Sequence, residues 1–299
     1  MTIQTVGGGA GSLTGIALAR MEVLEPSSAD GTRIGCELVG EGPPLLAVHG
    51  STADRHRFAA VQTRLAESFR LHLMDRRGRG LSAEETPADY SLEREAEDIR
   101  AVVAAIDGPV LVLAHSYGGA CALEAVTDCD GIARMLVYEP AFGTPQGPVF
   151  PDDALRDVDA ALARGDREAA LTIFFRRVLL LDEPSVDAVR ATPMWQARLG
   201  AVHTLAREAR AANPYRVEPE RLRAVRAPVR FLLGTETTPA LIRAAHAAHA
   251  ALPGSEFREL AGHGHAAMDA DPAIFVAEVE EWLGPASGSA APTRRSGNR

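Results

Sequence analysis

The sequence predicts an α/β protein built on a mostly parallel β-sheet with helices on both faces. Short runs of aliphatic and β-branched residues alternate with longer segments of helical periodicity along most of the chain. Several of the short runs are continuously apolar, as in strands whose two faces are both covered by helices. Sheets of this kind bind ligands at the carboxyl ends of their strands, so the search for a functional site starts there.

The predicted sheet begins with a hairpin. Segments 16–25 and 33–40 have strand character and flank Asp30-Gly31, a dipeptide typical of tight turns. The apolar run 44–48 predicts the next strand, and the elements then alternate in the order of the chain. Helices are predicted over 55–69, 91–106, 118–126, 239–252 and 272–283, and strands over 71–74, 110–114, 133–138, 229–233 and 256–260. The total is eight strands.

The alternation is interrupted over residues 142–226. Four segments with helical periodicity, 153–164, 167–181, 185–191 and 194–211, stand there between two predicted strands. An insertion of this size indicates a helical lid rather than a loop. Its aromatic and Met side chains either form an apolar inner face or pack the lid onto the core; they are Phe174, Phe175, Met194, Trp195 and Tyr215.

The chain therefore divides into a core, a lid and two tails. The core covers residues 16–141 and 227–283, and the lid covers residues 142–226. Residues 1–15 are rich in Gly and residues 284–299 in Gly, Ser, Pro and Arg, a composition that predicts a flexible N-terminal tail and a disordered C-terminal tail.

Composition excludes several classes of function. The chain has 299 residues and a net charge of −9, so neither nucleic acid nor an anionic membrane surface is expected as a partner. All 31 basic residues are Arg, which excludes chemistry that needs a Lys amine, such as a Schiff base or pyridoxal phosphate attachment. The three cysteines are too few for a disulfide framework or a zinc site, and no secretory signal or membrane span is visible, so a cytoplasmic location is expected.

A nucleophile motif follows the predicted strand 110–114. Ser116 stands between Ala114 and Gly118, at the point where this strand turns into the next predicted helix. A sharp strand-to-helix turn of this kind needs small residues around the nucleophile, and the helix N-terminus favours developing negative charge. Ala114 takes the place of the first Gly of the usual motif.

With this motif the chain resembles the α/β-hydrolase family, and the resemblance covers residues 16–283. His49-Gly50-Ser51 matches the oxyanion loop of the family, which implies that the backbone N–H groups of Ser51 and Tyr117 form the oxyanion hole. The run Asp75 to Ser82 is similar to a turn that braces the site, and Gly262-His263-Gly264-His265 is similar to the loop of the catalytic histidine. The spacing of that loop selects His265 as general base over His263.

Two positions compete for the carboxylate that should accept a hydrogen bond from the histidine. The family usually places it after the strand 229–233, but the matching position is Thr237, and Glu236 lies one residue earlier. Some relatives place it after the preceding strand, where Glu139 stands. We predict Glu139, held extended by Pro140, because an unpaired carboxylate ending an apolar strand is costly. A Glu139 paired with a lid Arg remains the alternative.

The resemblance implies a serine hydrolase that uses a Ser116-His265-Glu139 triad on an ester or thioester of a lipophilic acyl group, without cofactor or metal. The substrate is expected to be a small acyl compound, free or bound to a carrier protein. The chain also resembles hydrolases and thioesterases of actinomycete secondary metabolism, including those that release polyketides. The alternatives are a cyclase or lyase that uses His265 for proton transfer, a cofactor-free haloperoxidase-type enzyme and a binding module. The oligomeric state is not predicted.

Overall fold

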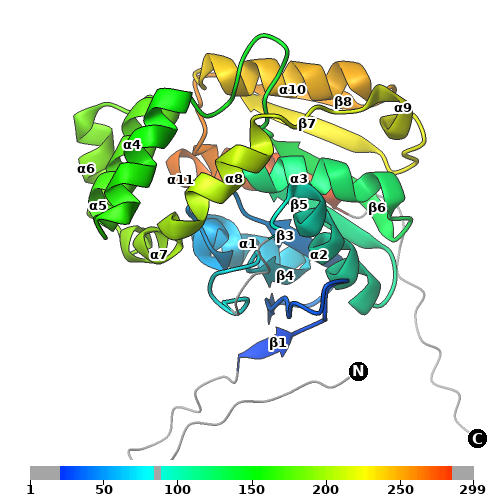
Figure 1. The fold of residues 1–299 in the computed structure, drawn as a ribbon. Helices are drawn as coiled ribbons and strands as arrows, with labels where there is room; N and C mark the ends of the chain where they lie inside the picture. Colours follow the sequence, from blue (N-terminus) through cyan, green and yellow to red (C-terminus); the bar gives the residue numbers. More distant parts are fainter. Residues whose placement is uncertain (1–20, 84–88, 285–299) are drawn as a thin grey trace, which may run out of the picture.

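The computed structural model describes residues 21–83 and 89–284 and contains a sheet with helices on both faces (Figure 1). In this part of the chain eight strands pair in the order β1-β2-β4-β3-β5-β6-β7-β8. The first two form the predicted hairpin, β2 runs antiparallel to β4, and all other pairs are parallel. The strands are β1 Glu22–Leu24, β2 Cys36–Val39, β3 Pro44–Val48, β4 Arg70–Met74, β5 Val110–His115, β6 Ile132–Tyr138, β7 Val229–Gly234 and β8 Glu256–Leu260. The predicted fold class and strand order along the chain are confirmed.

Two hydrophobic cores hold the sheet between its helices. On one face α2 (Leu92–Ala105), α3 (Tyr117–Ala125) and α10 (Pro239–Ala251) bury their apolar sides. The other face is covered by α1 (Ala59–Ser68), α11 (Ala267–Ala270) and α12 (Pro272–Leu283). The short 3-10 helices η1 (Arg55–Phe58) and η2 (Val126–Asp128) adjoin α1 and α3. The strands between the two layers are apolar on both faces because both faces are buried.

The segment between β6 and β7 is helical, and part of it stands off to one side of the sheet (Figure 1). Its elements are α4 Asp152–Ala163, α5 Arg167–Ile173, the π-helical turn η3 Phe174–Val178, α6 Glu183–Arg190, α7 Met194–Ala201, the 3-10 turn η4 Val202–Thr204, α8 Leu205–Ala212 and α9 Pro219–Leu222. The prediction of one continuous helix over 167–181 and of another over 194–211 was wrong, because each segment is divided into shorter elements. A π turn ends the first, and a 3-10 turn divides the second so that α8 crosses back to the core.

The tails predicted at 1–15 and 284–299 lie outside the described residues, except for Gly284. The same holds for residues 16–20 of the predicted hairpin. Within 21–83 and 89–284, no helix is both long enough and apolar enough to cross a lipid bilayer.

A buried ionic network joins α8 to the core. Glu208 of α8 accepts a hydrogen bond from Arg76 at 2.5 Å and another from Arg79, and Arg76 also pairs with Glu95 of α2. The Arg76 and Glu208 side chains have no exposed surface. Burial alone would raise the pKa of Glu208, but the two guanidinium groups outweigh it and hold the pKa well below the usual range. Glu208 is therefore a buried anion on which the attachment of α8 depends.

We expect Glu208→Gln to destabilise the fold by about 3 kcal/mol, a fall in Tm of roughly 6–9 °C, because it leaves two buried guanidinium charges short of a counter-charge. Thermal unfolding followed by circular dichroism at neutral pH measures this. The matched control is Glu218→Gln in the same helical segment, where the side chain is exposed and the expected change is within about 0.5 kcal/mol. Equal Tm values for the two variants would contradict the assignment.

Candidate active site

Ser116 lies in a strained turn between β5 and α3, as the motif predicts. Its φ of 58° is in the left-handed region, which L residues rarely adopt. Hydrogen bonds from Ser116 N–H to the Tyr138 carbonyl (2.9 Å) and from Ala141 N–H to the Ser116 carbonyl (3.0 Å) hold the turn. A Cβ atom at Gly118 would stand 2.4 Å from the His49 carbonyl oxygen, so only glycine fits there. The small residue of the motif is thus required by the close approach of the β3 loop.

The loop after β3 packs directly on Ser116. A Cβ at Gly50 would lie 2.6 Å from Ser116 Cβ, so this position also requires glycine. His49 holds the loop: its Nδ1–H donates to the Gly50 carbonyl (2.8 Å), and its Nε2 accepts from Arg76 N–H (3.1 Å). Ser51 follows on the same loop, and Tyr117 is the first residue of α3, where a backbone N–H has no acceptor within the helix. Of the two predicted oxyanion donors, Tyr117 directly follows Ser116 in the chain, and Ser51 lies on the loop that packs against Ser116.

Glu139 and His265 are joined at the carboxyl edge of the sheet. His265 Nδ1–H donates to Glu139 Oε2 at 2.5 Å, and the carboxylate has no exposed surface. The carboxylate also accepts from Gly234 N–H (2.8 Å, to Oε1) and from the Thr237 hydroxyl (2.7 Å, to Oε2). These three donors give the buried charge a full set of partners and fix its direction toward the imidazole. Glu139 is not paired with an Arg of the helical segment.

The backbone of Glu139 does not have the predicted extended conformation. We expected Pro140 to impose it, but φ at Glu139 is 49°, in the left-handed region. Glu139 N–H donates to the Leu232 carbonyl (3.1 Å) while its side chain accepts the three hydrogen bonds described above. Those contacts outweigh the local preference of a residue before proline, at a cost of order 1–3 kcal/mol that is common at functional sites.

The other residues considered for the acid do not contact His265. Glu236 is exposed and its side chain has no hydrogen bond to His265, while its backbone N–H donates to the His263 carbonyl at 2.9 Å. Thr237, at the family's usual acid position, touches Glu139 instead and donates to it. The His263 carbonyl thus accepts from Glu236 in the loop, and the Thr237 hydroxyl helps to orient the Glu139 carboxylate toward His265.

Ser116 and His265 line one cavity of about 440 Å³, without a hydrogen bond between them in the described structure. Contacts of this kind are often long before substrate binds. His115 lies beneath His265, with its ring centroid 4.5 Å from that of His265 and its Nε2–H donating to the His265 carbonyl (3.1 Å). Burial, followed by the nearby His265, lowers the pKa of His115 well below the usual range, so this ring is neutral and supports the loop.

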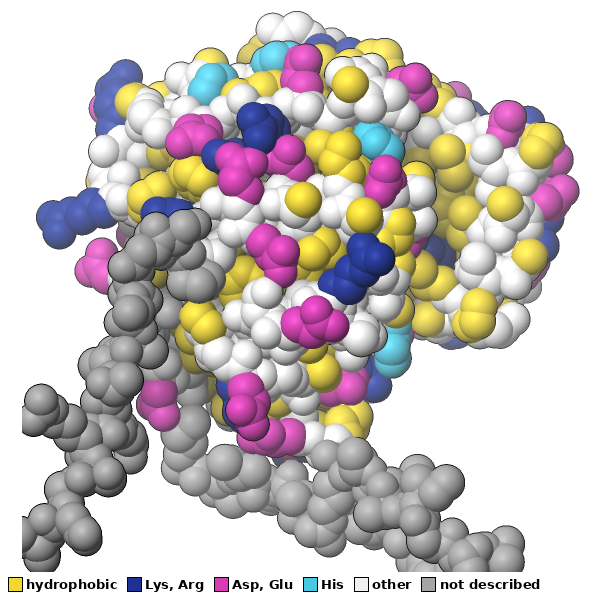
Figure 2. All heavy atoms as spheres, turned by 180° about the vertical axis from the view of Figure 1, so that it is seen from behind, with side chains coloured by type: hydrophobic (Ala, Val, Ile, Leu, Met, Phe, Trp, Pro, Cys, Tyr) yellow, Lys and Arg dark blue, Asp and Glu magenta, His cyan; other side chains and the backbone are white. Residues whose placement is uncertain are grey.

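The cavity lies between the core and the helical segment, and Figure 2 shows hydrophobic side chains around the hollow between these parts. Of the five residues predicted to form an apolar inner face, Phe174, Phe175 and Met194 line it. Trp195 stacks on Phe175 behind the wall, and Tyr215 packs against Phe142 instead. The π turn η3 supplies the two phenylalanines, which agrees with the frequent occurrence of such turns at functional sites.

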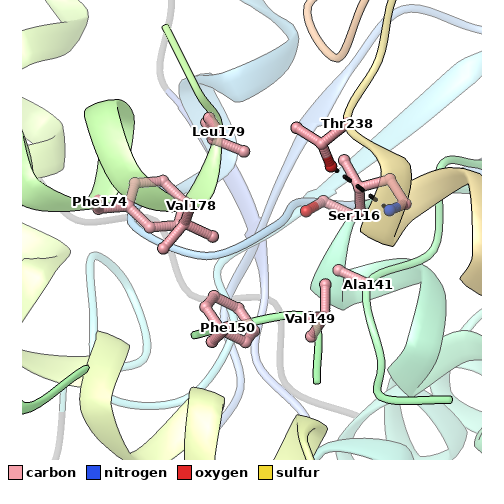
Figure 3. A pocket seen from close by; sticks show the side chains of 9 residues that line it. Ser116, Ala141, Val149, Phe150, Phe174, Val178, Leu179 and Thr238 are labelled. Carbon is pink, nitrogen blue, oxygen red and sulfur yellow. Dashed lines mark hydrogen bonds between the residues drawn. The ribbon is translucent and has the colours of Figure 1, made fainter. Parts of the chain in front are cut away.

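A second, much smaller hollow of about 10 Å³ lies beside Ser116 (Figure 3). Phe174 and Val178 of η3 lie on one side of it, and Val149 and Phe150 come from the chain after β6. Thr238 closes it beside Ser116, its hydroxyl accepting from Leu241 N–H (3.4 Å). The hollow has room for about one water-sized group.

Two arginines that the sequence analysis did not single out line the large cavity. Arg57, at the start of the helix after β3, is almost fully buried and pairs with Asp269 at 2.7 Å. Arg198 of α7 also reaches the cavity, and no local pattern distinguishes it from the other arginines of the helical segment. In the described residues no group of three or more His, Cys, Asp or Glu side chains is arranged to hold a metal ion.

Comparisons with known proteins agree with this fold. A family model described as "Alpha/beta hydrolase family" matches residues 45–279. A hydrolase structure from Sphaerobacter thermophilus is 28% identical and superposes with a TM-score of 0.72, covering 85% of this chain and 99% of its own. An uncharacterized protein of Mycobacterium tuberculosis is 27% identical over 87% of this chain and 81% of its own length. The pimeloyl-[acyl-carrier protein] methyl ester esterase of Xanthomonas oryzae is 31% identical over 41% of this chain and 46% of its own length.

Proposed function

The chain belongs to the alpha/beta hydrolase family, and on that premise we propose that it is a serine esterase that works through an acyl-enzyme. The observation that carries the proposal is the hydrogen bond between His265 and the buried Glu139, at the rim of the cavity that also contains Ser116. A nucleophile, a base and a group that orients the base are the three parts that this chemistry needs. The esterase among the relatives supports the same class of reaction.

Each residue then has one role. His265 Nε2 takes the proton of the Ser116 hydroxyl as its oxygen attacks the ester carbonyl, and Glu139 stabilises the imidazolium that forms. The N–H groups of Ser51 and Tyr117 donate to the oxyanion, each contributing about 3–4 kcal/mol in comparable sites. His265 returns the proton to the leaving alcohol and then activates the water that releases the acid. His115 and Tyr138 position the loop of His265, since Tyr138 donates to the Gly264 carbonyl.

The cavity suits a substrate with a sizeable apolar part. Its volume of about 440 Å³ is in the range of small-molecule sites, and Leu179, Leu181 and Val189 add to the aromatic wall. A lipophilic acyl group fits this wall. A thioester, free or on a carrier protein, would be attacked by Ser116 in the same way. Cleavage of a thioester and a role in secondary metabolism stay predictions.

A covalent probe tests the proposal. A fluorophosphonate is expected to label the protein at one residue per chain, Ser116, identified by peptide mass spectrometry, because only a Ser activated by its base reacts at a useful rate. The same preparation is expected to hydrolyse 4-nitrophenyl butyrate and N-acetylcysteamine thioesters, and the ratio of the two rates separates esterase from thioesterase. Folded protein that is neither labelled nor active would overturn the proposal and favour proton transfer by His265, as in a cyclase or lyase.

A further inference from the structure

One arginine of the cavity is buried without a counter-charge. Six arginines are buried in the described part of the chain, and five of them pair with a carboxylate: Arg57 with Asp269, Arg76 and Arg79 with Glu208, Arg77 with Asp98, and Arg230 with Glu256. Arg198 is the exception. Its side chain is 8% exposed and has no carboxylate within ion-pair distance among the described residues. A buried charge without a partner is costly, so such a group calls for a functional reason.

The contacts of Arg198 leave most of its donors unused. Nη1–H donates to the Thr52 hydroxyl at 3.1 Å, Nη2 lies 3.7 Å from the Met194 sulfur, and the guanidinium lies 5.2 Å from the centre of the Phe175 ring. Nε is buried without any partner in the described structure. A guanidinium has five N–H donors in a planar fork. Nη1 and Nη2 each keep one N–H group without a partner in the described structure, and Arg198 lines the cavity, so this end of the fork is the part that a ligand would meet.

The charges around the cavity do not cancel. Of the residues that line it, Arg57 and Arg198 are positive and Asp269 is negative. The Arg57–Asp269 pair is neutral as a unit, and Asp269 and Asp54 act on Arg198 only from beyond ion-pair distance, since Asp269 pairs with Arg57 and Asp54 caps the helix η1. Burial, followed by the charge of Arg57, lowers the pKa of Arg198, yet a guanidinium stays protonated near neutral pH. The wall therefore carries one uncompensated positive charge.

Arg198 also lies close to the reaction centre. The Thr52 hydroxyl that it holds belongs to the residue directly after Ser51, and Thr52 has a strained φ of 55°. Ser116 and His265 line the same cavity as Arg198. A molecule that reaches from Ser116 into the large cavity thus passes apolar side chains and meets a cation.

We propose that Arg198 binds a carboxylate of the substrate, so that the ester cleaved at Ser116 carries an anionic group on the part that fills the large cavity. The proposal rests on the function proposed above. One unpaired guanidinium matches a singly charged carboxylate, which accepts two parallel hydrogen bonds from the fork, better than it matches a doubly charged phosphate. The apolar wall then contacts the chain between the ester and the carboxylate.

Two pairs of esters, similar in size and different in charge, test the proposal. Mono(4-nitrophenyl) adipate against 4-nitrophenyl hexanoate places the carboxylate on the acyl side, and 4-acetoxybenzoate against its methyl ester places it on the leaving group. In at least one pair the wild-type protein is expected to prefer the anion by tenfold or more in kcat/KM. Arg198→Gln is expected to lower kcat/KM for that anion by about 10- to 100-fold more than for the neutral ester of the same pair, mainly through KM.

Two further variants distinguish carboxylate binding by Arg198 from a general effect of the substitution on the structure. Arg198→Lys keeps the charge without the fork and is expected to retain part of the preference. Arg190→Gln removes a half-exposed arginine of the same helical segment that pairs with Asp187, and is expected to leave the preference unchanged. A wild-type preference for the neutral ester in both pairs, or equal losses on both members of a pair in Arg198→Gln, would overturn the proposal.

A binding measurement separates this proposal from the proposed hydrolysis. In calorimetric titrations hexanoate is expected to bind the wild-type protein at least tenfold more tightly than hexanamide, and Arg198→Gln is expected to remove that difference. This result does not depend on turnover. If no ester is cleaved and Ser116 is not labelled, the esterase proposal fails, and hexanoate binding then shows separately whether Arg198 binds a carboxylate. If esters are cleaved but hexanoate binding is the same in wild type and Arg198→Gln, only the role of Arg198 fails.

Discussion

Glu139→Gln is expected to lower kcat by about 10⁴-fold, with little change in KM, on 4-nitrophenyl butyrate. Gly234 N–H and the Thr237 hydroxyl hold the two carboxylate oxygens, and His265 Nδ1 shares Oε2 with Thr237. In the Gln variant the amide oxygen accepts from Gly234, so the NH2 group faces His265. The imidazole must then accept at Nδ1 and carry its proton on Nε2, where it is unable to take the proton of Ser116.

The control for this variant is Glu236→Gln, which changes the other candidate acid. Its side chain is exposed and makes no hydrogen bond to His265, so kcat is expected to stay within about threefold of wild type, as for a surface substitution. Thermal unfolding of both variants checks that they are folded. A large loss in Glu236→Gln together with near-normal turnover in Glu139→Gln would reassign the acid.

Ser116→Ala is expected to lower kcat by about 10⁶-fold and to abolish labelling by the fluorophosphonate. The loss is larger than for Glu139→Gln because it removes the nucleophile itself, whereas the other variant keeps the nucleophile and misdirects the base. Hydrolysis by Ser116→Ala above the rate in buffer would measure the contribution of the oxyanion donors and of substrate positioning without the nucleophile.

The matched control is Ser68→Ala, at a partly exposed serine that donates to Glu280 and does not line the cavity, and its kcat is expected to equal that of wild type. Stopped-flow measurement of the first turnover extends the comparison, since an acyl-enzyme gives a burst of 4-nitrophenol in wild type that is absent from Ser116→Ala. Retention of more than about 1% of kcat in folded Ser116→Ala would exclude this serine as the nucleophile.

The elbow was predictable because its geometry depends on neighbours in the chain, and the oxyanion loop was predicted from its resemblance to that of the family. Ser116 requires small residues within two positions of it, and the Gly positions are read directly as sites where another backbone comes close. His265 was selected over His263 because its position in the loop resembles that of the family's histidine. The structure brings His265, and not His263, to the carboxylate.

The conformation and the partners of Glu139 were less predictable. The local rule for a residue before proline predicts an extended backbone, and the observed φ of 49° follows from contacts with Leu232, Gly234, Thr237 and His265, which are at least 93 positions away along the chain. A sequence pattern contains no distances between such residues. The sequence narrowed the choice of the triad acid to Glu139 and Glu236. The packing of β6 against β7 directs Glu139 toward the imidazole of His265, whereas Glu236 is exposed to solvent.

By itself, the sequence determined the class of fold, the order of the strands along the chain and the turn that presents Ser116, because each depends on hydrophobic periodicity or on residue sizes within a few positions, and the resemblance to a family pointed to the loop of His265. Only the tertiary structure decided which carboxylate faces His265, how η3 lines the cavity and where Arg198 lies without a counter-charge. These features arise where the strand ends and the helical segment meet, and burial and pairing of charges there are set by residues far apart in the sequence.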